Sequence, residues 1–235
     1  MFRALIDQAL VGLLPPTCVL CGAPGAAGLD LCTGCLDDLP RNSHACTRCA
    51  LPLPVGTGAG AMCGPCQRQP PSYDSCHVPF LYRGGIRTLV AGIKFRGGLN
   101  QARLLGLCLA RSLRESEGER PALITPVPLH PLRLRERGYN QALEIARTVT
   151  RELGIPVAPA LCVRLRAITP QEGLDKEARR SNVRGAFEVQ APLRSRHIAI
   201  LDDVVTTGST AAEVATVLRQ AGAKRIDLWA LARTP

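Results

Sequence analysis

The chain has 235 residues, of which 46% are hydrophobic and 20% are charged, so its composition fits a packed globular protein and excludes global disorder. No uninterrupted apolar run approaches the ~18 residues of a membrane span, which excludes a typical integral membrane protein. The formal net charge is +10, but residues 1–76 carry four Lys/Arg against five Asp/Glu, so all of the excess lies in residues 77–235.

The first sixteen residues predict a short amphipathic helix that stops at Pro15 and Pro16. Asp7 and Gln8 interrupt its apolar stretch, and it lacks a small-residue cleavage site, so it does not read as an export signal. We therefore expect a cytoplasmic protein without membrane insertion.

Cysteine and charge both change near residues 70–78. Nine of the eleven cysteines lie at or before Cys76, whereas the basic excess follows it. Together with the prolines of this stretch, the two shifts predict a domain boundary there. We expect an N-terminal helix at 1–16, a cysteine-rich unit at 17–72 and a basic domain at 77–235.

Four Cys-x-x-Cys pairs occur in the cysteine-rich unit. Each pair supplies half of a tetrahedral zinc shell, so four pairs predict two structural zinc sites. A disulfide framework is disfavoured in the cytoplasm, a redox pair would explain one motif but not four, and an iron–sulfur cluster remains an alternative. Short intervals favour the pairing of consecutive motifs, although a crossed pairing is possible. The predicted ligands are Cys18, Cys21, Cys32 and Cys35 for one site, and Cys46, Cys49, Cys63 and Cys66 for the other.

The basic domain alternates strand-like and helix-like segments. This alternation predicts a parallel sheet covered by helices, an α/β fold. The expected strands are 77–83, 122–129, 197–205 and 225–233, and the expected helices are 86–95, 99–115, 139–153 and 209–222.

The segment 198–213 carries the clearest chemistry. An apolar strand ends in Asp202 and Asp203, and a hydroxyl-rich loop containing Gly208 then leads into a helix. Ligands of open α/β sheets bind at the carboxyl ends of strands, and a helix N-terminus attracts phosphate. The segment therefore predicts a ribose 5-phosphate site, with an ordinary strand–turn–helix as the alternative.

The sequence LDDVVTTGST (201–210) resembles the phosphoribosyl-pyrophosphate (PRPP) signature of type I phosphoribosyltransferases. With the cysteine pairs, it makes nearly the whole chain resemble the ComF family, whose members join a double zinc ribbon to a type I phosphoribosyltransferase domain. The other segments that carry this resemblance are 82–97, 126–141 and 169–187. The resemblance implies PRPP and magnesium binding and a role in natural competence, the uptake and handling of transforming single-stranded DNA.

The resemblance also assigns roles to residues. Asp202 and Asp203 would be catalytic, holding the ribose hydroxyls and, through water, magnesium. The remaining PRPP-binding set is Val204, Val205, Thr206, Thr207, Gly208, Ser209 and Thr210 around the 5-phosphate, Pro128, Leu129 and His130 at the pyrophosphate, and Lys94, Arg137 and Lys176 as further phosphate contacts. Lys176 lies in a stretch, 169–184, that would form a lid. The alternatives are a backbone-bonded His130 and a solvated helix start for the arginines at 133, 135 and 137.

Two classes of function follow. The chain is either a PRPP-dependent transferase acting on an unidentified amine or base, or a binding protein that uses its PRPP pocket as a sensor or nucleic-acid clamp and contacts competence proteins. The basic domain suits both, because PRPP and single-stranded DNA are both polyanions. Glutamine-dependent amidotransfer is not expected, since Met1 is followed by Phe2 and not by a catalytic cysteine.

Overall fold

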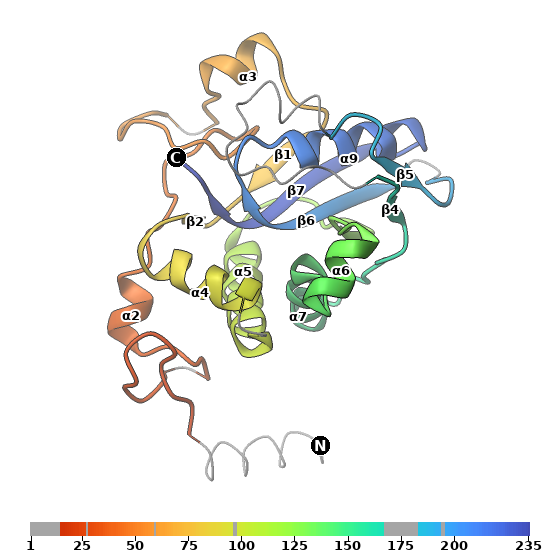
Figure 1. The fold of residues 1–235 in the computed structure, drawn as a ribbon. Helices are drawn as coiled ribbons and strands as arrows, with labels where there is room; N and C mark the ends of the chain where they lie inside the picture. The colour runs from red at the N-terminus through yellow and green to blue at the C-terminus, as the bar shows by residue number, and fades with distance from the viewer. Residues whose placement is uncertain (1–14, 27, 59, 96–97, 167–182, 194–195) are drawn as a thin grey trace.

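The computed structural model of the chain describes residues 15–26, 28–58, 60–95, 98–166, 183–193 and 196–235. Its centre is a parallel sheet in the order β1-β7-β6-β3, and β2 also pairs with β7 (Figure 1). The strands are β1 (Ser75–His77), β2 (Phe80–Leu81), β3 (Leu123–Pro126), β6 (His197–Val205) and β7 (Arg225–Arg233). The predicted N-terminal helix and most of the predicted lid, including Lys176, lie outside the described residues.

β6 and β7 are the two long strands, and they pair in register from His197 opposite Arg225 to Val205 opposite Arg233. Successive residues of β6 enter opposite cores: Ile198 and Ile200 pack on one face, Ala199 and Leu201 on the other. Burial on both faces explains the nearly continuous apolar run of this strand. The sequence predicted the bounds of both strands correctly.

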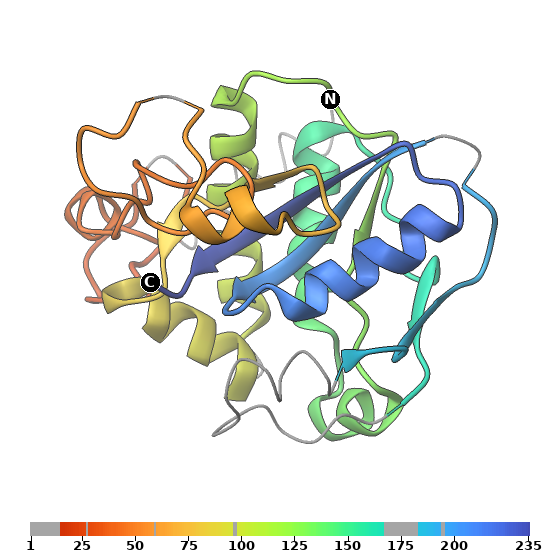
Figure 2. The same ribbon diagram turned by 90° about the horizontal axis from the view of Figure 1, so that it is seen from above.

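Helices cover both faces of the sheet, which confirms the predicted α/β architecture. α4 (Gly84–Phe95), α5 (Leu99–Glu115) and α7 (Gln141–Leu153) pack on one face, whereas α9 (Ser209–Gln220) packs on the other, as Figures 1 and 2 show. The four predicted helices agree with these bounds to within two residues at each end. The side chain of Asn140 caps α7 by accepting from the amides of Ala142 and Leu143, and Gly154 ends this helix in a left-handed conformation.

The predicted strand 77–83 is wrong as a continuous strand. The structure has β1 and β2 instead, separated by Val78 and Pro79, and both lie along the same strand, β7. Pro79 lacks an amide hydrogen and interrupts the ladder, while its carbonyl accepts from the Asn42 amide at 2.9 Å. β3 is likewise shorter than the predicted 122–129, because it ends at Pro126.

Among the described residues, four short elements were not predicted: α2 (Thr33–Asp37), α3 (Gly64–Arg68) and the antiparallel strands β4 (Cys162–Arg164) and β5 (Phe187–Val189). A fifth, α6 (Pro131–Arg137), was foreseen only as the alternative for its arginines. Each is at most seven residues long, too short to show a clear periodicity.

The cysteine-rich unit shares its core with the rest of the chain. Leu29, Leu31 and Leu39 are buried in one cluster with residues of α4 and α5. Ala50 is buried in the cluster on the α9 face of the sheet, together with Tyr73, which directly follows the unit. Since the unit has too few aliphatic residues for a core of its own, it is stabilised by packing on the sheet and its helices. Among the described residues, the structure has no helix of the length and apolarity needed to cross a membrane.

Replacement of Gly106 by alanine is expected to destabilise the protein. Gly106 lies where α5 packs closely on α7, and an added Cβ would stand 2.7 Å from the Cβ of Thr148. Such overpacking costs about 1–3 kcal/mol in the free energy of unfolding, measurable by chemical denaturation. Gly58→Ala is the control, because nothing lies within 4 Å of its Cβ position; equal stability of the two variants would contradict the prediction.

Candidate functional site

The eight paired cysteines form two separate clusters. One contains Cys18, Cys21, Cys32 and Cys35, the other contains Cys46, Cys49, Cys63 and Cys66, and the sulfur atoms within each cluster lie within 4.8 Å of one another. The Sγ–Sγ distances from Cys21 to Cys32 and from Cys49 to Cys63 are both 3.6 Å, close to the ~3.8 Å that a tetrahedral zinc–thiolate shell requires. The donor sets thus fit two four-cysteine zinc sites, and the predicted pairing of consecutive motifs is confirmed.

The predicted carboxylates and Lys94 come together at the carboxyl end of β6. Asp202 and Asp203 are half-buried there. Nζ of Lys94 forms an ion pair with Oδ2 of Asp203 at 3.0 Å. Lys94 belongs to the last turn of α4, about 109 residues earlier in the chain. The contact between them is therefore tertiary, and it places one fixed cation beside the carboxylate pair.

Burial and the neighbouring charge of Asp203 raise the pKa of Asp202 to about 8. Burial works against the charge of Lys94, but the carboxylates of Asp203 and Asp202 outweigh it and raise the pKa of Lys94. The raised pKa of Lys94 favours its charged form beside Asp203, whereas the raised pKa of Asp202 favours its protonated form in the absence of a bound cation.

The loop between β6 and α9 forms a small concavity lined by Asp202 and by residues 204–211. Gly208 has a φ of +76°, a left-handed conformation that suits glycine, and Tyr73 Oη would lie only 3.2 Å from an added Cβ. The hydroxyls of Thr207 and Ser209 are 2.9 Å apart, and the Ser209 amide donates to Thr207 Oγ1. Since the first amides of a helix lack intrahelical partners, this end of α9 can hold an anion.

A buried arginine that the sequence analysis missed fixes this loop from behind. Arg233, the last residue of β7, donates from Nη1 to the carbonyl of Val205 at 3.1 Å and to that of Thr206, and from Nε to the carbonyl of Cys49 at 3.1 Å. All described peptide bonds are trans, so the amides paired with the first two carbonyls point away from Arg233. Arg233 thereby links the second zinc site to the loop and orients the loop's peptide groups.

The predicted pyrophosphate loop lies at the same edge of the sheet. β3 is parallel to β6, and the Val127 amide donates to the Leu201 carbonyl at 2.8 Å, so Pro128, Leu129 and His130 follow beside the carboxylates. His130 Nδ1 accepts from the Leu132 amide at 3.3 Å and caps α6, which is the backbone-bonded role foreseen as the alternative.

The arginines of α6 are not joined to the carboxylate pair. Arg133 is exposed and pairs with Glu136 at 3.2 Å, and Arg135 is also exposed. Arg137 is half-buried in the last turn, and among the described residues no hydrogen bond or ion pair connects it to Asp202 or Asp203. Arg133 and Arg135 thus correspond to the solvated helix that the sequence left as an alternative.

Arg164 is a further cation that the sequence analysis missed. It belongs to β4, and its guanidinium lies 5.7 Å from the ring centroid of Phe187 on β5. Burial and the charge of Arg133 lower the pKa of Arg164, while Asp202 acts in the opposite direction. Its Nε is buried and has no hydrogen-bond partner in the described part of the chain. The two-stranded hairpin thus brings a second half-buried cation within electrostatic reach of Asp202.

Comparisons with known proteins show which family this chain resembles. The family described as "Double zinc ribbon domain" matches residues 9–71. The "DNA utilization protein YhgH" of Escherichia coli K12 is 33% identical over 226 residues, which is 94% of this chain and 98% of that protein. "Competence protein F" of Haemophilus influenzae is 33% identical over 210 residues, 86% of this chain and 90% of that protein. The chain belongs to the ComF family.

Solved structures are more distantly similar to this ComF-family chain. A purine phosphoribosyltransferase from Pyrococcus horikoshii matches 57% of this chain and 82% of its own length at 20% identity, with a TM-score of 0.36. A glutamine PRPP amidotransferase from B. subtilis matches 55% of this chain and 25% of its own length at 18% identity, also with a TM-score of 0.36.

Double cysteine variants are expected to report the zinc pairing by metal content. Cys18 and Cys32 belong to one cluster, so Cys18→Ser/Cys32→Ser should retain one zinc per chain. Cys18→Ser/Cys46→Ser removes a ligand from each cluster and should retain none. Native mass spectrometry distinguishes the two, and the reverse result would show crossed pairing.

The pKa of Asp202 predicts a pH-dependent effect of Asp202→Asn. The pKa of Asp202 is about 8 in the folded chain and about 4 in the unfolded chain. Between these values the unfolded chain loses the proton more readily than the folded chain, so the stability of the wild type falls progressively as the pH rises. The Tm of the variant should match that of the wild type near pH 4 and exceed it by roughly 2–6 °C at pH 9.

Scanning calorimetry across this pH range tests the prediction. Asp37→Asn, on an exposed position of α2, is the control and should not change the pH profile. A wild type that is more stable than Asp202→Asn at pH 9 would show that the ionised carboxylate is favourably held.

Proposed function

We propose that this chain binds PRPP with magnesium at the carboxyl end of β6, and that it serves the use of transforming DNA in the cytoplasm. The observation that carries the proposal is the convergence of a carboxylate pair, Lys94 and a hydroxyl-rich loop at one edge of a parallel sheet. Open α/β sheets bind ligands at this edge. The order of these groups also suits a phosphorylated sugar.

In this proposal the 5-phosphate occupies the concavity of the loop before α9. The amides of the first turn and the hydroxyls of Thr206, Thr207, Ser209 and Thr210 are its donors. Asp202 and Asp203 face the ribose hydroxyls, because carboxylates accept hydrogen bonds but repel phosphate.

The diphosphate of PRPP needs positive charge. We assign this role to the backbone of Pro128–His130 with Lys94 and, from the resemblance alone, to Arg137 and Lys176. Arg164 joins them, because its charge interacts with that of Asp202. Magnesium prefers oxygen ligands and keeps several waters, so the carboxylate pair fits a water-mediated contact with a magnesium ion bound to the diphosphate.

The cellular part of the proposal rests on the relatives. Their names refer to competence and to DNA utilization, and they match this chain over nearly its whole length. Single-stranded DNA is the partner that the basic residues 77–235 suit, since lysines and arginines neutralise phosphates. The double zinc ribbon would then contact competence proteins or brace the nucleotide site.

An active transferase is the second reading, and the same geometry favours it. If PRPP is cleaved, charge develops on the departing pyrophosphate, and the cations around it would stabilise that charge. Asp202 and Asp203 would hold the ribose while the acceptor approaches C1. The two readings share the PRPP site and differ in whether turnover follows.

Calorimetric titration with PRPP and magnesium tests the shared part. The wild type should bind, and Asp202→Asn/Asp203→Asn should weaken binding by about 100-fold or more, because two charge-assisted contacts are lost. Asp37→Asn/Asp38→Asn is the matched control, since it neutralises an adjacent pair of exposed aspartates on and beside α2.

A folded, zinc-loaded wild type that does not bind PRPP would overturn the proposal. In that case, single-stranded DNA binding that weakens steeply with salt would favour a nucleic-acid clamp. Pyrophosphate release in the presence of an acceptor would instead establish the transferase.

A further inference from the structure

The two zinc sites begin with the same backbone turn. In the first site the Gly22 amide donates to the Cys18 carbonyl at 2.8 Å, and in the second the Ala50 amide donates to the Cys46 carbonyl at 2.7 Å. The turn places both residues in the left-handed region, with φ of +79° at Gly22 and +53° at Ala50. Glycine adopts that conformation freely, whereas the Cβ of alanine opposes it. The turn at Ala50 is therefore strained, and it persists only while its surroundings hold it.

Metal ligation by Cys46 and Cys49 holds this turn closed. The sulfur atoms of their cluster lie within 4.8 Å of one another, as a four-thiolate shell requires. The free energy of metal binding at such a site is spent on folding the residues around it. Without the metal, Ala50 would relax toward a negative φ, and the peptide group that joins Cys49 to Ala50 would change its orientation.

The same peptide group is bonded to Arg233. Its oxygen, the carbonyl of Cys49, accepts from Arg233 Nε at 3.1 Å. Nη1 of the same guanidinium donates to the carbonyls of Val205 and Thr206, which begin the loop before α9. Arg233 is only 7% exposed, and a buried donor that loses its acceptor is costly. The rigid fork of the guanidinium therefore relates the orientation of the loop to that of the turn at the metal site.

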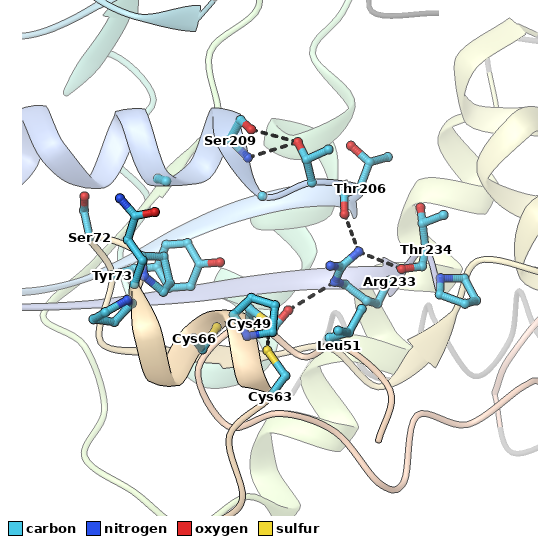
Figure 3. A pocket seen from close by; sticks show the side chains of 18 residues that line it. Cys49, Leu51, Cys63, Cys66, Ser72, Tyr73, Thr206, Ser209, Arg233 and Thr234 are labelled. Carbon is cyan, nitrogen blue, oxygen red and sulfur yellow. Dashed lines mark hydrogen bonds between the residues drawn. The ribbon is translucent and has the colours of Figure 1, made fainter. Parts of the chain in front are cut away.

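The space around this connection is open. A cavity of about 500 Å³ lies between the second zinc site and the back of the loop (Figure 3). Among the described residues, no hydrogen bond joins residues 46–66 directly to residues 204–210. Since the walls of a cavity lack contacts across it, Arg233 is the polar connection between the two.

The first zinc site lacks this connection. Its turn uses Gly22, which is not strained, and Cys18 is buried in the cluster formed with α4 and α5. In the part of the chain that the structure describes, no hydrogen bond joins residues 17–37 to Arg233 or to the loop. The molecule thus contains its own control, because both sites have four cysteines but differ in their link to the loop.

We propose that the metal of the second zinc site and the 5-phosphate at the loop bind cooperatively through Arg233, and that the first site takes no part. This inference rests on the proposed function and assigns a regulation to the same site. With the second cluster closed, the Cys49 carbonyl orients Arg233, and Arg233 holds the Val205 and Thr206 carbonyls so that the paired amides face the phosphate. Because coupling between two binding sites is reciprocal, phosphate binding tightens the second metal by the same factor. A shortage of zinc accordingly lowers the affinity for PRPP.

Cysteine protection tests this coupling on the full-length protein with two zinc ions. A chromogenic chelator withdraws zinc with and without PRPP and magnesium, and iodoacetamide then labels the cysteines that have lost their metal. Saturating PRPP should raise the chelator concentration that exposes the second cluster about tenfold, within the usual range of coupling factors, and should leave exposure of the first cluster unchanged. A titration without protein corrects for zinc that PRPP itself binds.

Arg233→Lys supplies the second arm. Lysine keeps the charge but lacks the fork that reaches carbonyls on two sides, so the factor should fall from about ten to below about two while both zinc ions are retained. Arg196→Lys is the matched control; Arg196 is exposed directly before β6, at the opposite end of the sheet, and the variant should keep the wild-type factor. The zinc content of each variant verifies that it is folded.

The outcomes separate the coupling from the proposed function. PRPP binding that protects neither cluster, or protects both equally, would overturn the coupling alone, and so would a factor unchanged in Arg233→Lys. A folded wild type with two zinc ions that does not bind PRPP would overturn the proposed function and the coupling together.

Discussion

The buried guanidinium of Arg233 joins two distant parts of the chain, the second zinc site and the loop after β6. One nitrogen donates to the carbonyl of Cys49 beside the second zinc site, and another donates to the carbonyls that begin the loop after β6. Planar peptide groups transmit this constraint, since fixing a carbonyl on one side fixes the next amide on the other. The anion-binding face of the loop therefore depends on a buried side chain behind it.

Each zinc site packs against the sheet or its helices. The first packs with the leucines around it into the core of α4 and α5, and the second lies against the end of β7. The ribbon is too small for its own core and is held by the sheet, and its Cys49 carbonyl is an acceptor for Arg233. Two regions of different composition thus build one site.

The charges at the carboxyl end of β6 partly balance one another. Lys94 pairs with Asp203 at 3.0 Å, and burial raises the pKa of Asp202 to about 8, so the repulsion between the two adjacent aspartates is reduced. A bound cation or sugar hydroxyl would shift that balance. The hairpin β4–β5 adds Arg164 within electrostatic reach of the same carboxylates.

Much of this protein was determined locally by its sequence. The spacing of the cysteine pairs indicated two zinc sites, the two long strands were predicted with their bounds, and the Asp-Asp and hydroxyl-Gly-hydroxyl pattern located the candidate site. These features follow from neighbours in the chain: thiolates two residues apart, apolar runs buried on both faces, and a loop that joins a strand to a helix. The division of 77–83 by Pro79 and the short strands at 162–164 and 187–189 escaped prediction, because few residues carry their pattern.

Only the tertiary structure decided which groups converge. Lys94 could be suspected from its place in the sequence. Its pairing with Asp203, the approach of Arg164 to Asp202 and the role of Arg233 depend on segments that are distant in the chain. A buried arginine at the end of a strand looks in sequence like a polar residue entering a loop. Its function depends on which carbonyls face it after folding, and packing of the sheet, the helices and the ribbon sets that geometry.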